Sequence, residues 1–275
     1  PESSSPGRLH PWPGRTSGSR WDTIRNAGPL LSEVRASKFD LVHSFFRIES
    51  LTPILPLSVP KLMTYQRAVT RRTVKTGHSI SRGTLSFSAI SHWMMKGVDD
   101  VGKWYMVPNG VPLEKFDYVA KVEKDAPLVF LGRIEEIKGP HRAIEVARRS
   151  NNRLIIAGNI PSGEESWFES HVKPHIDGGQ IQYIGPVDDA EKNALLGQSK
   201  AFLMDISWDE PFGIVMAEAL ACGTPVVGTR RGAVPEVIEH EKSGFVVDDT
   251  SGMIAAIANI ENIDRAECRK RAQLN

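Results

Sequence analysis

Ten short apolar runs alternate with longer stretches of helical character, and this alternation constrains the fold more than any other feature of the chain. The runs lie at residues 40–45, 60–65, 85–91, 104–108, 127–132, 153–158, 181–185, 200–206, 224–229 and 244–247. Several are β-branched and apolar at successive positions, as strands covered on both faces are. Helices are expected between them at residues 140–149, 164–171, 188–196 and 212–221. This order predicts an α/β fold with parallel sheets and right-handed crossovers.

A turn sequence divides the chain into two parts. Pro108-Asn109-Gly110 is followed by a charged stretch that reaches Asp125, and 275 residues are enough for two medium-sized domains. We therefore predict an N-terminal domain over residues 29–110 and a C-terminal domain over residues 111–275. Residues 1–28 are rich in Pro, Gly, Ser and Arg and lack periodicity. We expect loop or disorder there, with organised sequence beginning at a helix near residues 21–36.

Composition argues against several classes of protein. The net charge is +1, so no strong field favours nucleic acid. Cys222 and Cys268 have neither metal-ligand spacing nor a disulfide framework, which suits a reducing cytoplasm. No apolar run approaches the ~20 residues needed to span a bilayer. The first residues lack the apolar middle region of a signal peptide. We therefore expect a cytoplasmic globular protein.

The segment DEPFGIVMAEALACGTPVV at residues 209–227 is the most informative in the chain. Residues 213–222 are apolar on every side of a helix except at Glu218, and Gly223 is placed to end that helix. A buried carboxylate without a partner is costly and rare. Two interpretations are open: Glu218 pairs with a buried Arg or caps neighbouring backbone, or it meets a polar ligand.

Helix geometry makes a nucleotide one such ligand. The first turn offers N–H groups near Phe212 to Ile214 and the positive end of the helix dipole, and such an end binds phosphate. Glu218 lies four residues beyond Ile214, on the same face and one turn deeper, where ribose hydroxyls could reach it. Glu210 lies at the carboxyl end of the strand at 200–206, where open parallel sheets bind ligands.

Glu210 and Glu218 are separated by seven residues, and Pro-Phe-Gly-Ile follows the first of them. This pattern resembles the signature of glycosyltransferase family 4, and the resemblance extends from about residue 40 to residue 247. It implies the GT-B fold, with two Rossmann-like domains of which the N-terminal one is incomplete here. It also implies that Glu210 contacts the donor sugar and Glu218 the ribose, while Gly213 and Ile214 give N–H groups to the phosphates.

Two cations follow the strand at 127–132. Gly132 ends this strand, and Arg133 and Lys138 flank a short loop before the next helix. Cations at the carboxyl end of a strand can neutralise a diphosphate leaving group. The alternative is a solvated loop in which neighbouring Glu residues pair with them. The resemblance implies the first interpretation, with Gly132, Arg133 and Lys138 at the donor phosphates and no metal or other cofactor.

Three features of residues 29–110 concern the acceptor. His43 ends a strand that resembles one of the family, although a lone His in a strand is more often structural. Gln66 stands where many family members have His, and Gln can hydrogen-bond a hydroxyl but cannot shuttle a proton at neutral pH. A basic cluster follows, which is either a solvated helix face or a peripheral contact with an anionic acceptor or a membrane surface: Arg67, Arg71, Arg72, Lys75, His78 and Arg82.

The resemblance also raises the question of completeness. The family opens with a strand, a Gly-rich turn and a helix, which do not precede Asp40, and closes with a helix that crosses back to the first domain. We expect the sequence to be a fragment that binds nucleotide through residues 111–250, transfers little sugar and tends to aggregate.

The sequence thus predicts a retaining glycosyltransferase that moves a sugar from a nucleotide sugar to an unknown sugar, lipid or small-molecule acceptor. The expected catalytic residues are Glu210, Arg133 and Lys138, and the expected donor contacts add Gly132, Phe212, Gly213, Ile214 and Glu218. Two alternatives stand beside it. One is an epimerase or phosphorylase of the same architecture, and the other is a nucleotide-sugar-binding module without turnover.

Overall fold

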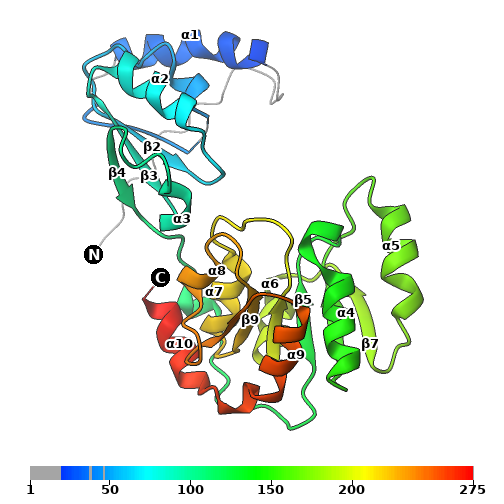
Figure 1. Cartoon of the computed structure of the whole chain (residues 1–275). Coiled ribbons are helices and arrows are strands. Elements are labelled where there is room, and N and C mark those ends of the chain that lie inside the picture. The colour runs from blue at the N-terminus through cyan, green and yellow to red at the C-terminus, as the bar shows by residue number, and fades with distance from the viewer. Residues whose placement is uncertain (1–19, 37–38, 46, 275) are drawn as a thin grey trace. The chain divides into compact units, whose positions relative to one another are not determined.

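The computed structural model of the chain describes residues 20–36, 39–45 and 47–274 (Figure 1). These residues form two compact units. The first extends to Ile90 and includes Met95–Val107, and the second comprises Ser91–Met94 and the chain from Pro108 onward. The break after Val107 lies close to the boundary that we expected after residue 110.

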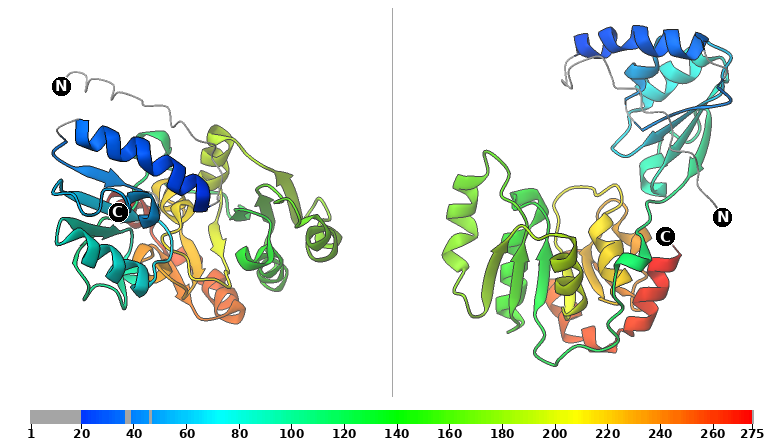
Figure 2. Two further views of the ribbon diagram at one scale, coloured as in Figure 1. Left: turned by 90° about the horizontal axis from the view of Figure 1, so that it is seen from above. Right: turned by 180° about the vertical axis from the view of Figure 1, so that it is seen from behind.

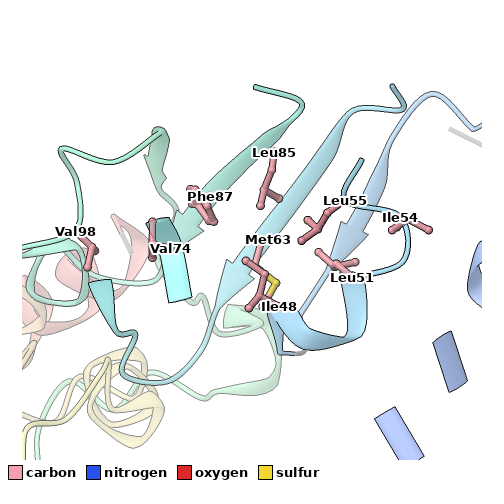
Figure 3. Packing of buried hydrophobic residues seen from close by; sticks show 9 residues of the cluster. All are labelled: Ile48, Leu51, Ile54, Leu55, Met63, Val74, Leu85, Phe87 and Val98. Atoms are coloured by element: carbon pink, nitrogen blue, oxygen red, sulfur yellow. The ribbon is translucent and has the colours of Figure 1, made fainter. Parts of the chain in front are cut away.

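A parallel sheet of four strands underlies the first unit. In spatial order these are β1 (Val42–Ser44), β2 (Lys61–Tyr65), β3 (Leu85–Ala89) and β4 (Lys103–Met106). Helices α1 (Arg20–Ala36) and α2 (Arg71–Ser81) belong to this unit, and the short α3 (His92–Met95) follows β3. Nine buried apolar side chains form the core beneath them (Figure 3): Ile48, Leu51, Ile54, Leu55, Met63, Val74, Leu85, Phe87 and Val98.

Helix α1 corrects one expectation from the sequence. Residues 20–28, for which we predicted loop or disorder, are helical, and residues 1–19 lie outside the described residues. Gly28 and Pro29 disfavour a helix interior, but the helix expected near residues 21–36 is confirmed. Leu30, Leu31 and Val34 nevertheless pack against the core, and this packing stabilises the helix despite its poor propensity.

A parallel sheet of six strands underlies the second unit. In spatial order these are β10 (Gly244–Val247), β9 (Val226–Thr229), β8 (Ala201–Met204), β5 (Leu128–Leu131), β6 (Leu154–Ala157) and β7 (Ile181–Gly185). The chain builds outward from β5 to β7 on one side and then from β8 to β10 on the other. The order therefore reverses between β5 and β8, and such a switch point is where open α/β sheets bind ligands.

Helices cover both faces of this larger sheet (Figure 2). Helices α4 (Pro140–Arg149) and α9 (Thr250–Ala258) pack together, and α7 (Ile214–Ala221) packs with both α6 (Asp189–Gly197) and α10 (Arg265–Gln273). The remaining helices of the unit are α5 (Glu165–His171) and α8 (Val234–Val237). Each of the ten predicted strands and each of the five predicted helices has a counterpart, but α7 begins at Ile214 rather than at Phe212.

Candidate functional site

Two loops leave neighbouring strands at the switch point. Strand β5 pairs with β8 in parallel, so the loop that begins at Gly132 and the loop that begins at Asp205 emerge at the same edge of the sheet. The first loop carries Arg133 and Lys138, and the second carries Glu210. The candidate residues from two distant parts of the sequence are therefore brought together by the sheet.

Close backbone packing fixes the two loops against each other. Gly139 has a left-handed φ of 79°, and a Cβ atom there would lie 1.8 Å from the carbonyl oxygen of Asp205. Only glycine fits so near a carbonyl. Arg142 donates to the same oxygen through Nε and Nη2 at 3.0 and 2.6 Å. Burial raises the pKa of the Asp205 carboxyl, although Thr250 and Arg142 oppose that shift. The two loops are thus packed directly against each other.

Lys138 and Glu210 form an ion pair at this edge. The Nζ atom of Lys138 lies 3.0 Å from Oε2 of Glu210, with only 19% and 12% of the two side chains exposed. The same ammonium lies 4.2 Å from the centroid of the Trp208 ring, a cation–π distance. Two of the three expected catalytic residues are therefore in direct contact.

Helix α7 begins at the end of the second loop. Its N-cap, Gly213, has φ of +81°, and a Cβ atom there would lie 2.5 Å from Cε of Met216. The first turn of a helix leaves N–H groups without intrahelical acceptors, so Ile214 and Val215 offer donors at this point. Phe212, which we expected among these donors, is a buried side chain with 3% exposure just before the helix.

Glu218 is buried on α7 and is paired with a lysine. Its residue exposure is 8%, and its Oε1 atom lies 2.8 Å from Nζ of Lys192 on α6. A buried ion pair was one of the two interpretations left open by the sequence, but the cation is Lys192 rather than an arginine. The ion pair does not exclude a ligand, because both side chains line a depression in the surface.

This depression has a volume of about 360 Å³. It contains four of the expected donor contacts, namely Gly132, Arg133, Ile214 and Glu218. Its other walls include residues that follow β6 and β7 and that the sequence did not single out: Gly158, Asn159, Pro186, Val187 and Lys192. Depressions of about 430 and 390 Å³ at the opposite edge of the sheet, on either side of residues 119–125, contain none of the expected residues.

The basic and polar candidates for acceptor contact all belong to the first unit. The imidazole Nε2 of His43 lies 2.7 Å from Oγ1 of Thr64, which in turn lies 2.5 Å from Oγ of Ser88, so a polar chain crosses β1, β2 and β3. Gln66 directly follows β2 and is exposed. In the basic cluster, Arg71 is paired with Asp100 and also donates to a backbone carbonyl.

Arg67, Arg72 and Lys75 of that cluster are exposed. No helix among the described residues combines the length and the apolar character needed to cross a bilayer.

Comparison with known proteins shows the family to which this chain is similar. Residues 113–274 match the family described as glycosyl transferases group 1. The N-acetyl-alpha-D-glucosaminyl L-malate synthase of Bacillus anthracis is 41% identical over 48% of this chain and 35% of its own length. The chain spans less than two thirds of the length of its curated relatives.

Solved structures establish the fold. The glycosyltransferase from Rickettsia africae ESF-5 has a TM-score of 0.74 at 18% identity, with 95% of this chain and 79% of that chain covered. HepE of Anabaena, solved in complex with UDP, has a TM-score of 0.73 at 15% identity, with 91% and 77% covered. The expected α/β fold of the GT-B class, with two parallel sheets, is confirmed.

Proposed function

Because the chain belongs to the group 1 glycosyl transferases, we propose that it transfers a sugar from a nucleotide sugar to an acceptor with retention of the anomeric configuration. One observation carries this proposal. The start of α7, Arg133 and the buried carboxylate of Glu218 line a single depression at the switch point of the larger sheet. Backbone donors and a cation suit a diphosphate, and a carboxylate suits ribose hydroxyls.

Different charged residues bind the three parts of the donor. The diphosphate binds at the N–H groups of Gly213 and Ile214 and at Arg133. The ribose binds at Glu218. Lys138, which is paired with Glu210 in the free protein, turns its ammonium toward the leaving diphosphate. Glu210 is then free to accept from hydroxyls of the donor sugar. No metal or other cofactor is required in this proposal, because Arg133, Lys138 and the helix dipole supply the positive charge.

The reaction breaks the bond between the anomeric carbon and the diphosphate oxygen. An acceptor hydroxyl attacks the same face of the sugar, and its proton passes to the departing diphosphate. Fixed positive charge stabilises the growing negative charge on that group, and positioning of the two substrates supplies the remainder of the rate enhancement. The acceptor is a sugar, a lipid or a small molecule. In this proposal the protein lies in the cytoplasm. There the exposed cations Arg67, Arg72 and Lys75 contact the membrane surface peripherally.

Gln66 favours a second candidate. A glutamine in place of a histidine cannot shuttle protons at neutral pH. A nucleotide-sugar-binding module without turnover would tolerate this change, and a GT-B epimerase would need no acceptor at all.

A screen of UDP-, GDP-, ADP- and dTDP-sugars by thermal shift, followed by product analysis, separates these functions. A ligand at 100 times its Kd should stabilise the protein by about 2.7 kcal/mol. Transfer to an added acceptor, with an unchanged anomeric configuration in the product by NMR, would support a retaining transferase. Inversion, or epimerised donor with no transfer, would contradict it. Binding without any turnover would favour the module.

A further inference from the structure

Lys192 lines the same depression as Glu218, yet the proposed donor contacts do not include it. It lies in the first turn and a half of α6, whose start is fixed by a capping box between Asp188 and Glu191. A cation near the beginning of a helix is opposed by the helix dipole. The i,i+3 ion pair with Asp189 offsets this effect, but its carboxylate is exposed and the pair is screened by solvent.

The contacts of Lys192 point toward Glu218. Its Nζ atom lies 2.8 Å from Oε1 of Glu218 and 3.2 Å from Oδ1 of Asp189. The lysine and Glu218 side chains are 21% and 10% exposed, whereas the Asp189 side chain is 87% exposed. Burial lowers the pKa of Lys192, but the bonds to and charges of Glu218 and Asp189 outweigh burial and leave that pKa raised. The pair with Glu218 is thus the better shielded of the two.

The two oxygens of Glu218 differ in their surroundings. Oε1 accepts the hydrogen bond from Lys192. Among the described residues, none donates a hydrogen bond to Oε2. The Glu218 side chain lines the depression. One oxygen is therefore engaged by the protein, and the other accepts no hydrogen bond from the described residues.

We propose that Lys192 is a positioning residue for the donor: it fixes the carboxylate of Glu218 through Oε1 so that Oε2 can accept from a ribose hydroxyl. The proposal rests on the proposed function, since it deepens the role of the same site. Without Lys192, the carboxylate would be left buried without its cation and would turn away or recruit water. The loss would then fall on ribose recognition in particular.

Four variants test this role: Lys192→Met, Lys192→Arg, Glu218→Gln and the double variant Lys192→Met with Glu218→Gln. Lys200→Met is a matched control, since Lys200 forms a 3.2 Å ion pair with Glu261 and precedes β8 at the opposite edge of the sheet. The probe is whichever of UDP, GDP and ADP binds the wild-type chain most tightly by calorimetry, together with its 2′-deoxy and 3′-deoxy forms. Lys192→Gln replaces Lys192→Met if the latter does not fold, as judged by its melting curve.

We expect Lys192→Met to weaken the binding of the ribonucleotide about tenfold, because the hydrogen bond from the ribose hydroxyl loses its fixed charged acceptor. The wild type should bind one of the two deoxy forms least tightly. The preference of Lys192→Met for the ribonucleotide over that deoxy form should nearly vanish. In the Glu218→Gln background, Lys192→Met should have little further effect on binding. The Lys192→Arg variant should keep much of the wild-type affinity, and Lys200→Met should bind like the wild type.

Two different failures can be told apart. Preserved ribose discrimination in Lys192→Met, or equal losses with and without Glu218, would overturn the positioning role while leaving the donor site intact. No binding of any nucleoside diphosphate by the wild type, or no effect of Glu218→Gln, would instead contradict the proposed function.

Discussion

Substitution of Glu218 tests the ribose contact directly. Glu218→Gln keeps the shape of the side chain and one acceptor oxygen, whereas Glu218→Ala removes both oxygens. We therefore expect Ala to weaken the binding of a nucleoside diphosphate more than Gln does.

The structure sets the scale of this effect. Hydrogen bonds to a charged acceptor contribute roughly 1.5–3 kcal/mol, and each 1.4 kcal/mol or so is tenfold in affinity. A loss of at least about tenfold is expected for Glu218→Ala. Stability should fall by less than the roughly 3–5 kcal/mol of a fully buried broken pair, because Lys192 is 21% exposed and keeps Asp189 at 3.2 Å.

Calorimetric titration with UDP, GDP and ADP measures the effect. Glu261→Ala is a suitable control, since it removes the partner of Lys200 far from the depression. Nucleotide affinity that is unchanged in a folded Glu218→Ala variant would refute the ribose contact.

Three further predictions concern the surrounding residues. Arg133→Ala and Lys138→Ala should lower kcat more than donor affinity, because both cations lie where charge grows as the diphosphate leaves; steady-state kinetics in which KM alone changes would indicate ordinary ground-state binding. Gly213→Ala should destabilise the protein by about 1–2 kcal/mol or more, since its φ is +81° and the new Cβ would meet Met216; an unshifted urea midpoint would exclude this strain. Arg265→Met should destabilise the protein by roughly 3 kcal/mol, because the buried guanidinium donates to three backbone carbonyls and to a threonine hydroxyl; a melting temperature within a degree of the wild type would contradict it.

The strands of the larger sheet could be predicted because strands that are buried on both faces are apolar at successive positions. Strand β8 is buried at each of its positions, Ala201 to Met204, and is apolar throughout. Helix α10 was missed for the opposite reason. Its side chains are mostly charged. Cys268 and Ala272 are its buried apolar residues, and Arg265 and Arg269 dock through hydrogen bonds to carbonyls of distant segments. Such contacts have no periodic signal in the sequence.

Some residues of the candidate site could likewise be predicted from the sequence, and others could not. Glu218 could be recognised because it is the one charge on an apolar helix, and Arg133 because it follows a buried strand. Asn159 and Val187 follow the neighbouring strands β6 and β7, so the rule that ligands meet the carboxyl ends of strands could have found them. Lys192 could not be found in that way, since only tertiary packing brings α6 beside α7.

A crystal structure of this chain with a bound nucleoside diphosphate would test the central claim most directly. We expect the diphosphate within hydrogen-bonding distance of the Ile214 N–H group and the Arg133 guanidinium, and a ribose hydroxyl on Oε2 of Glu218. A nucleotide bound instead beside residues 119–125, at the opposite edge of the sheet, would contradict it.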